Sequence, residues 1–168
     1  MIPKGSSPLL TKPARTEDHM RVDPTNPVVA LCAAGMAVEG DPAAARRLFQ
    51  QAWDSCADAY EASIAAHFLA RQQETSEGRL HWNSIAVERA KAVTDGRTRE
   101  FLPSLYLNLA DSCFMAGNRF AAVEAIDAAS RHLPALKEDG YRTFVERGIS
   151  SLRVRLAEAD NGAATRKP

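Results

Sequence analysis

The stretch from Phe101 to Pro134 constrains the fold of this chain most strongly, because it carries the pattern of two helices joined by a tight turn. Gly117-Asn118 marks the turn, and Pro134 ends the second helix since proline cannot continue an α-helix. Apolar residues recur at helical spacing on both sides of the turn, at Leu105, Leu109, Ala110, Cys113, Ala122, Val123, Ile126 and Ala129. Such a hairpin cannot bury both apolar faces alone, so the sequence predicts neighbours of the same kind.

The rest of the central region shows the same helical periodicity. Asn26-Pro27 and Asp41-Pro42 each combine an N-cap residue with proline at the first helical position, which predicts two helix starts. Thr75-Ser76-Glu77-Gly78 is expected to open another helix. The remaining helices are predicted from about Ala59 to Gln73 and from about Glu138 to Glu158. Seven helices and no sheet are therefore expected, which makes the fold class all-α.

The two ends of the chain lack this periodicity. Residues 1–25 are polar and contain four prolines, which is typical of a flexible tail, with an interaction tail as the alternative. Residues 159–168 are also expected to be a flexible tail. The helical domain is therefore predicted to occupy residues 26–158.

Charge and composition argue against some classes of function, although a local basic patch is still compatible with them. The chain has 21 Lys and Arg against 21 Asp and Glu, so it has no basic excess with which to neutralise nucleic-acid phosphates. No stretch is apolar enough to span a membrane, and the first ten residues lack the apolar run of a signal peptide. The three widely spaced cysteines favour buried, reduced thiols. We therefore expect a cytoplasmic protein that binds neither nucleic acid nor membrane.

Motifs of known chemistry are missing from the sequence. The chain has no GxGxxG, GxxxxGK[ST], GxSxG, HExxH or CxxC pattern, so we expect neither a cofactor nor a metal, and no residue is assigned to catalysis. The arginines of the last helix alternate with glutamates, and Glu138 and Arg142 have the i,i+4 spacing of an ion pair. We interpret that face as solvated and self-paired, and Trp53 and Trp82 as core or inter-repeat packing.

An internal repeat is the strongest long-range signal. Gly40, Gly78 and Gly117 are each expected to start a turn into a helix, and matched residues follow at fixed offsets. These are Ala45, Asn83 and Ala122 five residues later, Phe49, Val87 and Ile126 nine later, and Ala52, Ala90 and Ala129 twelve later. The first and last units also have a small residue seven positions before the glycine, at Ala33 and Ala110.

This pattern resembles the tetratricopeptide repeat, a helical hairpin with small residues at the crossing and proline after the second helix. The resemblance implies a right-handed α-α superhelix of about three hairpins with a C-terminal capping helix, as in short bacterial proteins of unassigned function. The middle unit departs from the pattern, because Asn83 replaces the small crossing residue and its first helix is expected to be about a turn longer. An unrelated helical bundle is the structural alternative.

A candidate binding site follows from the repeat. By the resemblance, the first helix of each unit lines a concave groove. His67 and Arg71 are four residues apart, so they share one face of such a helix. The candidate binding residues on these faces are Tyr60, Ser63, His67, Arg71, Ser104, Asn108 and Asp111. The alternative interpretations are a hydrogen-bonded structural network or a solvated face.

Three functions remain open from the sequence. The first is an adaptor that presents a groove to a peptide or protein partner. The second is a small-ligand-binding protein or an enzyme, with His67 and Asp111 as acid/base candidates. The third is self-association into a homodimer, which would cover the apolar ends of a short array.

Overall fold

The computed structural model describes residues 23–164, with side chains described as far as residue 159. Within this range the chain forms seven α-helices, one short 3₁₀ helix and no strand, which confirms the predicted all-α class. The helices are α1 (Pro27–Ala37), α2 (Pro42–Asp54), α3 (Ala59–Arg71), α4 (Ser76–Ala92), α5 (Leu102–Met115), α6 (Arg119–His132), η2 (Leu133–Ala135) and α7 (Gly140–Ala164). Most of the predicted N-terminal tail and residues 165–168 lie outside the described residues.

The first two helices start where the sequence predicts. Asn26 accepts hydrogen bonds from the backbone N–H groups of Val28 and Val29, and proline follows it at the first helical position. Asp41 caps α2 in the same way, with Pro42 after it. Side-chain capping satisfies N–H groups that have no partner inside the helix. These caps therefore fix where the first hairpin begins and turns.

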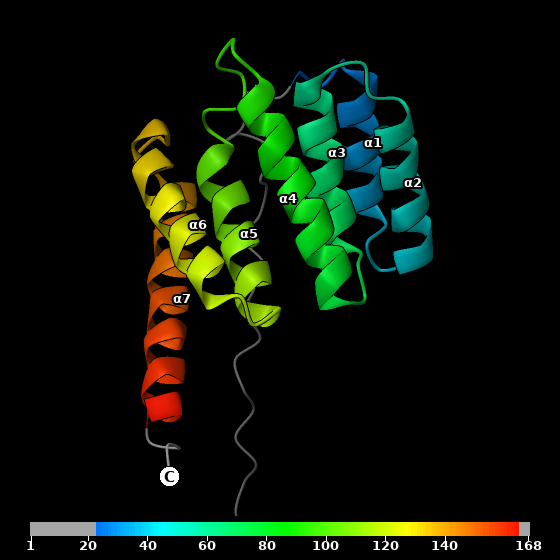
Figure 1. The fold of residues 1–168 in the computed structure, drawn as a ribbon. Coiled ribbons are helices and arrows are strands. Elements are labelled where there is room, and N and C mark those ends of the chain that lie inside the picture. The colour runs from blue at the N-terminus through cyan, green and yellow to red at the C-terminus, as the bar shows by residue number, and fades with distance from the viewer. Residues whose placement is uncertain (1–22, 165–168) are drawn as a thin grey trace, which may run out of the picture.

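Consecutive helices form three hairpins that stand side by side, and α7 packs at the end of the row (Figure 1). The hairpins are α1 with α2, α3 with α4, and α5 with α6. The second helix of each hairpin also packs on the next helix in the chain, so α2 contacts α3, α4 contacts α5, and α6 contacts α7. The first helices behave less regularly, because α1 contacts α3 and α5 contacts α7, whereas α3 and α5 make little close backbone contact.

Small residues allow the helices of the first and third hairpins to cross closely. Ala110 and Ala122 are fully buried in the third hairpin, as predicted. In the first hairpin the close approach occurs at Gly35, where an added Cβ would lie 2.3 Å from the Phe49 ring. The prediction of Ala33 at this crossing is wrong, because Ala33 is exposed. The connection between α1 and α2, at residues 38–41, is longer than the connection between α5 and α6, at residues 116–118. This difference shifts the register of α1 against α2.

The middle hairpin departs from its neighbours, but not as predicted. Its second helix, α4, is the long one at 17 residues, whereas its first helix, α3, has the same 13 residues as α2. Gly78 does not start a turn, because Thr75 is the N-cap and Gly78 lies inside α4. Gly117, by contrast, has a φ of 78°, the left-handed conformation that glycine adopts without strain.

The core has a large cluster in the first two hairpins, which extends to Phe101 and Leu105 at the start of the third, and two smaller clusters between the third hairpin and α7. As predicted for a capping helix, α7 buries Val145, Ile149, Leu152 and Leu156. Phe144 belongs to the apolar pattern of this helix in the sequence and is expected to cover the hairpin too, but it is 63% exposed. Val123 was likewise predicted on the inner face of α6 and is 46% exposed. Both residues lie just beside the buried stripe of their helix.

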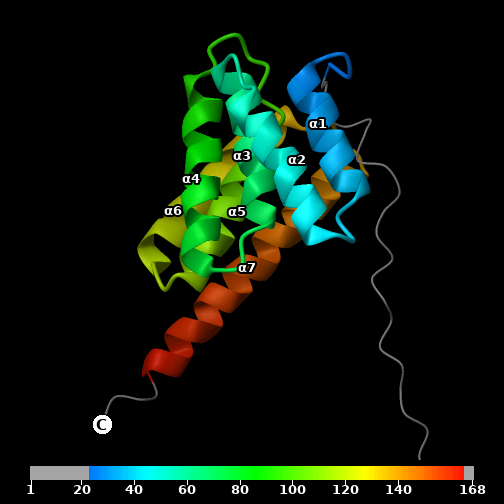
Figure 2. The same cartoon turned by 90° about the vertical axis from the view of Figure 1, so that its right-hand side faces the viewer.

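The last helix is longer than the sequence indicates. It begins at Gly140 and continues past Glu158 to Ala164, into the segment that was predicted to be a flexible tail. Its C-terminal end projects beyond the other helices (Figure 2). Across residues 23–164, no helix combines the length and the hydrophobicity that a membrane span requires.

Candidate functional site

Two of the predicted binding residues lie inside the protein. Tyr60 is 4% exposed, and its ring stacks on Phe101 and under the guanidinium of Arg97, 4.4 Å from the ring centre. Ser63 is fully buried, and its hydroxyl donates to the Tyr60 carbonyl oxygen within the helix. These side chains cannot touch a partner at the surface. The expectation that they line a groove is therefore corrected, and both support the packing of α3.

His67 and Asn108 meet where α3 faces α5. The Nδ1 atom of His67 lies 3.5 Å from the Asn108 side-chain nitrogen, and both residues are partly exposed. Burial lowers the pKa of His67 to about 4, and the nearby Arg71 charge lowers it further. The imidazole is therefore neutral at pH 7, so its Nδ1 can accept a hydrogen bond from the Asn108 amide.

The charged candidates form ion pairs, but not with one another. Arg71 pairs with Glu39 at 2.8 Å, from the connection between α1 and α2. Asp111 pairs with Arg155 of α7, also at 2.8 Å, and the Arg155 guanidinium covers the Phe114 ring. Arg71 and Asp111 therefore have separate partners and do not pair with each other. Each charge is instead tied to a different helix.

Ser104 takes part in the packing of α7. Its hydroxyl donates to the Phe101 carbonyl oxygen at 3.0 Å within the start of α5. A hydrogen bond between Ser104 and Tyr141 lowers the pKa of Tyr141, although burial of the phenol outweighs it and raises that pKa. Ser104 is therefore next to the cap and apart from the His67–Asn108 contact.

These contacts join into one continuous line of side chains, which we call the polar strip. Arg71 and His67 are one turn apart on α3, His67 meets Asn108, and Asn108 is one turn from Asp111 on α5. The strip consists of Glu39, Arg71, His67, Asn108, Asp111 and Arg155. All six residues are at least partly exposed. The strip crosses the whole row of helices from the first hairpin to α7.

The sequence reasoning missed both ends of this strip. Glu39 follows a helix and carries no motif, and Arg155 was interpreted as part of a self-paired face of the last helix. That interpretation holds for Arg142, which pairs with Glu138 at 3.6 Å and with Glu146 at 3.0 Å. Arg153 and Arg155 instead reach across to Asp127 and Asp111 on the third hairpin.

The geometry does not provide an acid/base pair at His67. Asp111 is bound to Arg155, and the nearest polar partner of the imidazole is the Asn108 amide, which cannot exchange a proton near neutral pH. Among the side chains described, no three His, Cys, Asp or Glu residues gather closely enough to hold a metal ion. The strip can form hydrogen bonds and exchange ion pairs.

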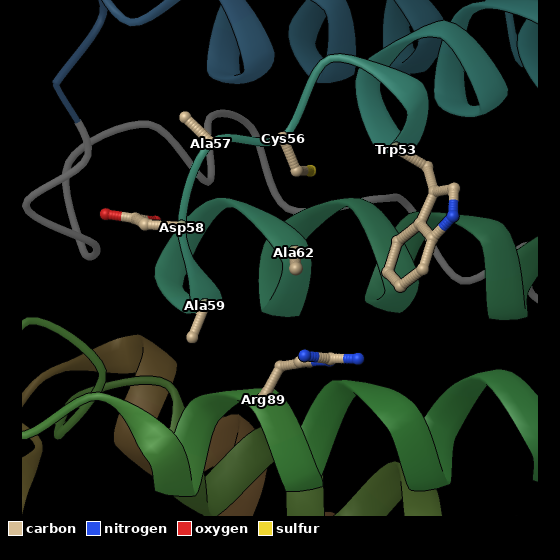
Figure 3. Close-up of a pocket in the computed structure, with 7 residues that line it drawn as sticks. All are labelled: Trp53, Cys56, Ala57, Asp58, Ala59, Ala62 and Arg89. Atoms are coloured by element: carbon tan, nitrogen blue, oxygen red, sulfur yellow. The ribbon is translucent and has the colours of Figure 1, made fainter.

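A second polar feature is a shallow furrow at the start of α3, with a volume of about 410 Å³ (Figure 3). Trp53 from α2 and Arg89 from α4 form its walls, and Ala59 and Ala62 of α3 form its floor. The Trp53 ring packs edge-on against Trp82 at 5.0 Å, so the two tryptophans pack between the first and second hairpins. The furrow shares no residue with the polar strip.

The cysteines are free thiols. Burial raises the pKa of Cys32 to about 12, and the neighbouring Cys56 adds to this effect. Burial also raises the pKa of Cys56 to about 11, helped by the carboxylates of Glu61, Asp58 and Asp54. Both thiols are therefore protonated at neutral pH and are poor nucleophiles.

Comparison of this chain with protein-family models, with curated proteins and with solved structures gave no match.

Proposed function

We propose that this protein is an adaptor that binds a peptide segment of a partner protein along the polar strip. In this proposal the three hairpins form a tetratricopeptide-like right-handed superhelix and α7 caps it. The regular packing of each second helix on the following helix supports such a stack. A row of rigid hairpins presents an extended surface without needing an enclosed pocket, which suits the recognition of a peptide.

The observation that carries the proposal is the continuity of the strip across all three hairpins and α7. Ion pairs between exposed side chains contribute only about 0–1 kcal/mol each. The Arg71 side chain is 44% exposed and that of Glu39 is 20% exposed, so the Arg71 guanidinium stays accessible to an acidic side chain or chain end of a partner. Because guanidinium forks form two hydrogen bonds with a carboxylate, the new pair would be well oriented.

Asn108 gives the strip a group suited to a peptide backbone. Its side-chain amide both donates and accepts, as a peptide group does, and its contact with His67 holds it in place at the surface. A bound segment would therefore run past Asn108 with its acidic group towards Arg71. The acid/base alternative is less well supported, because His67 and Asp111 have different partners.

The proposal is tested with an array of immobilised peptides of random sequence, probed with the full chain. We expect the bound peptides to be enriched in acidic residues. The double variant Arg71→Ala/Asn108→Ala should bind them at least about tenfold more weakly, since each lost charged hydrogen bond is worth roughly 1.5–3 kcal/mol before exchange costs.

Arg147→Ala is the matched control, because Arg147 is an exposed arginine on the outer face of α7. It should bind the same peptides as the natural chain. If the control and the strip variant bind equally well, peptides are recognised elsewhere. If the strip variant unfolds at a markedly lower temperature, the strip is a structural network and the proposal fails.

A further inference from the structure

The furrow at the start of α3 is open because its floor is made of small side chains. Ala59 and Ala62 carry only methyl groups, so nothing fills the space between the end of α2 and the facing side of α4 (Figure 3). The furrow is shallow and open to solvent, with a volume of about 410 Å³. The open space therefore results from which residues occupy the floor.

One wall of the furrow is a preorganised aromatic ring. Trp53 is partly buried, and its contact with Trp82 of α4 holds the indole in one orientation. An indole face offers a large apolar surface that needs no ordering before it binds a flat group. The first and second hairpins thus jointly build this wall.

The other wall carries an arginine that is not paired with a carboxylate among the side chains that the structure describes. Within residues 23–159, Arg89 forms no ion pair or hydrogen bond, whereas Arg71, Arg97 and Arg155 each hold a carboxylate. In Figure 3 the Arg89 guanidinium lies between α4 and Ala62 of α3, lower than the Trp53 ring. A guanidinium fork next to an apolar wall is the arrangement that binds a carboxylate with two parallel hydrogen bonds.

Asp58 lines the furrow itself, and Glu61 and Asp54 lie close to its Cys56 end, but each of these carboxylates already has a hydrogen-bond donor other than Arg89. Asp58 accepts from Arg97 at 2.8 Å, Glu61 accepts from Asn26 and from the Ala57 N–H, and Asp54 accepts from Gln50. Their combined field does reach the Cys56 thiol at the loop end. A bound carboxylate would therefore lie at the Arg89 wall, away from that loop.

We infer that this furrow binds a small carboxylate that carries a flat apolar group, with the carboxylate on Arg89 and the apolar group against Trp53. This site is independent of the polar strip and of the adaptor function. The ligand can be a free arylalkanoate or the C-terminal aromatic residue of a peptide, since both present the same two groups.

The test uses phenylacetate as the probe and Trp53 fluorescence as the signal. The chain has two tryptophans, so Trp82→Phe leaves Trp53 as the only one. We expect a saturable change in emission with phenylacetate and binding at least about tenfold weaker with the neutral analogue phenylacetamide. N-acetyl-phenylalanine imitates the C-terminal residue of a peptide, and its affinity is compared with that of its own amide in the same way. Tighter binding of N-acetyl-phenylalanine than of phenylacetate would identify a peptide end as the ligand, and the reverse would identify a free acid.

Two variants of the site sharpen this result. Arg89→Gln should weaken phenylacetate binding about tenfold, and Ala59→Leu should abolish it by filling the floor, while Arg147→Gln leaves it unchanged. Isothermal titration of the chain with both tryptophans repeats the comparison without Trp82→Phe. Equal binding of acid and amide, an unchanged affinity in Arg89→Gln, or no saturation at millimolar phenylacetate would each overturn the inference.

Discussion

Asn83 on α4 donates a hydrogen bond of 2.8 Å to the Ser112 hydroxyl on α5, inside the contact between the second and third hairpins. Both side chains are almost completely buried. The same amide lies 3.5 Å from the carbonyl oxygen of Asn108, a residue of the polar strip. A buried polar pair at a helix crossing favours one register, because any slip leaves both groups without a partner. Asn83 therefore joins the hairpins at the one junction where the first helices barely touch.

Asn83→Ala should destabilise the protein by about 1–3 kcal/mol, because it leaves the buried Ser112 hydroxyl without its partner. Denaturant unfolding of Asn83→Ala, Ser112→Ala and the double variant measures the coupling, which we expect to be on the order of 1 kcal/mol. Ser84→Ala is the control, since that exposed hydroxyl bonds only within its own helix. Strictly additive effects would show that the pair does not act as a unit.

Gly35→Ala should also be destabilising, although alanine normally stabilises a helix by up to about 1 kcal/mol relative to glycine. The new Cβ would lie 2.3 Å from the Phe49 ring, so α1 and α2 must move apart, at a net cost of about 1–3 kcal/mol. Gly40→Ala meets nothing within 4 Å and should change the free energy of unfolding by less than about 0.5 kcal/mol. Thermal unfolding compares the two, and equal melting temperatures would contradict the close crossing.

The capping role of α7 predicts a sharp contrast between two neighbouring residues. Leu152 is buried against the third hairpin, so Leu152→Ala should cost about 2–5 kcal/mol. Val154 is 56% exposed on the outer face, and Val154→Ala should cost less than about 0.5 kcal/mol.

A chain truncated after Pro134 tests the same cap more severely. It exposes the surface that Val145, Ile149, Leu152 and Leu156 cover, and it should aggregate or unfold. Size-exclusion chromatography with circular dichroism detects either outcome. A truncated chain that stays monomeric and equally stable would show that α7 is only an appendage.

The depressed pKa of His67 predicts loss of stability in mild acid. Its pKa is about 4 in the folded protein and near 6.5 when unfolded, so between these values the unfolded chain binds more protons. The contribution of the neutral His67 to the free energy of unfolding is therefore fully present above pH 6.5, and it is lost as the pH falls towards 4. Because the imidazole is partly exposed, we expect a loss of about 1–2 kcal/mol rather than the full value of the shift. His67→Gln should flatten this part of the stability profile, whereas a His67 signal that titrates near pH 6.5 in NMR spectra would disprove the burial.

The local features of the fold could be predicted from the sequence, because they depend on neighbouring residues. Asn26-Pro27 and Asp41-Pro42 act within one turn, and Gly117 alone supplies the left-handed residue of its turn. The edges of the buried stripes could not be predicted. Val123 and Phe144 lie at the border of an apolar face, where a shift of one helix against another decides burial.

The candidate site was only partly predictable for a related reason. His67 and Arg71 share a helix face by spacing alone, and His67 does meet Asn108. The pairing of Asp111 with Arg155 joins helices 44 residues apart, and only the position of α7 determines it. Gly78 matches Gly40 and Gly117 in the sequence repeat, but it lies inside α4 because Thr75 caps that helix three residues earlier.

The central claim, that the polar strip is the binding surface, is tested most directly by mapping a selected acidic peptide onto the chain with backbone amide NMR shifts. We expect the largest changes around Arg71, His67, Asn108 and Asp111, on α3 and α5, with little change on α2 and α6. The Arg71→Ala/Asn108→Ala variant should lose these changes at the same peptide concentration. Changes confined to other helices, or unaltered in that variant, would contradict the account.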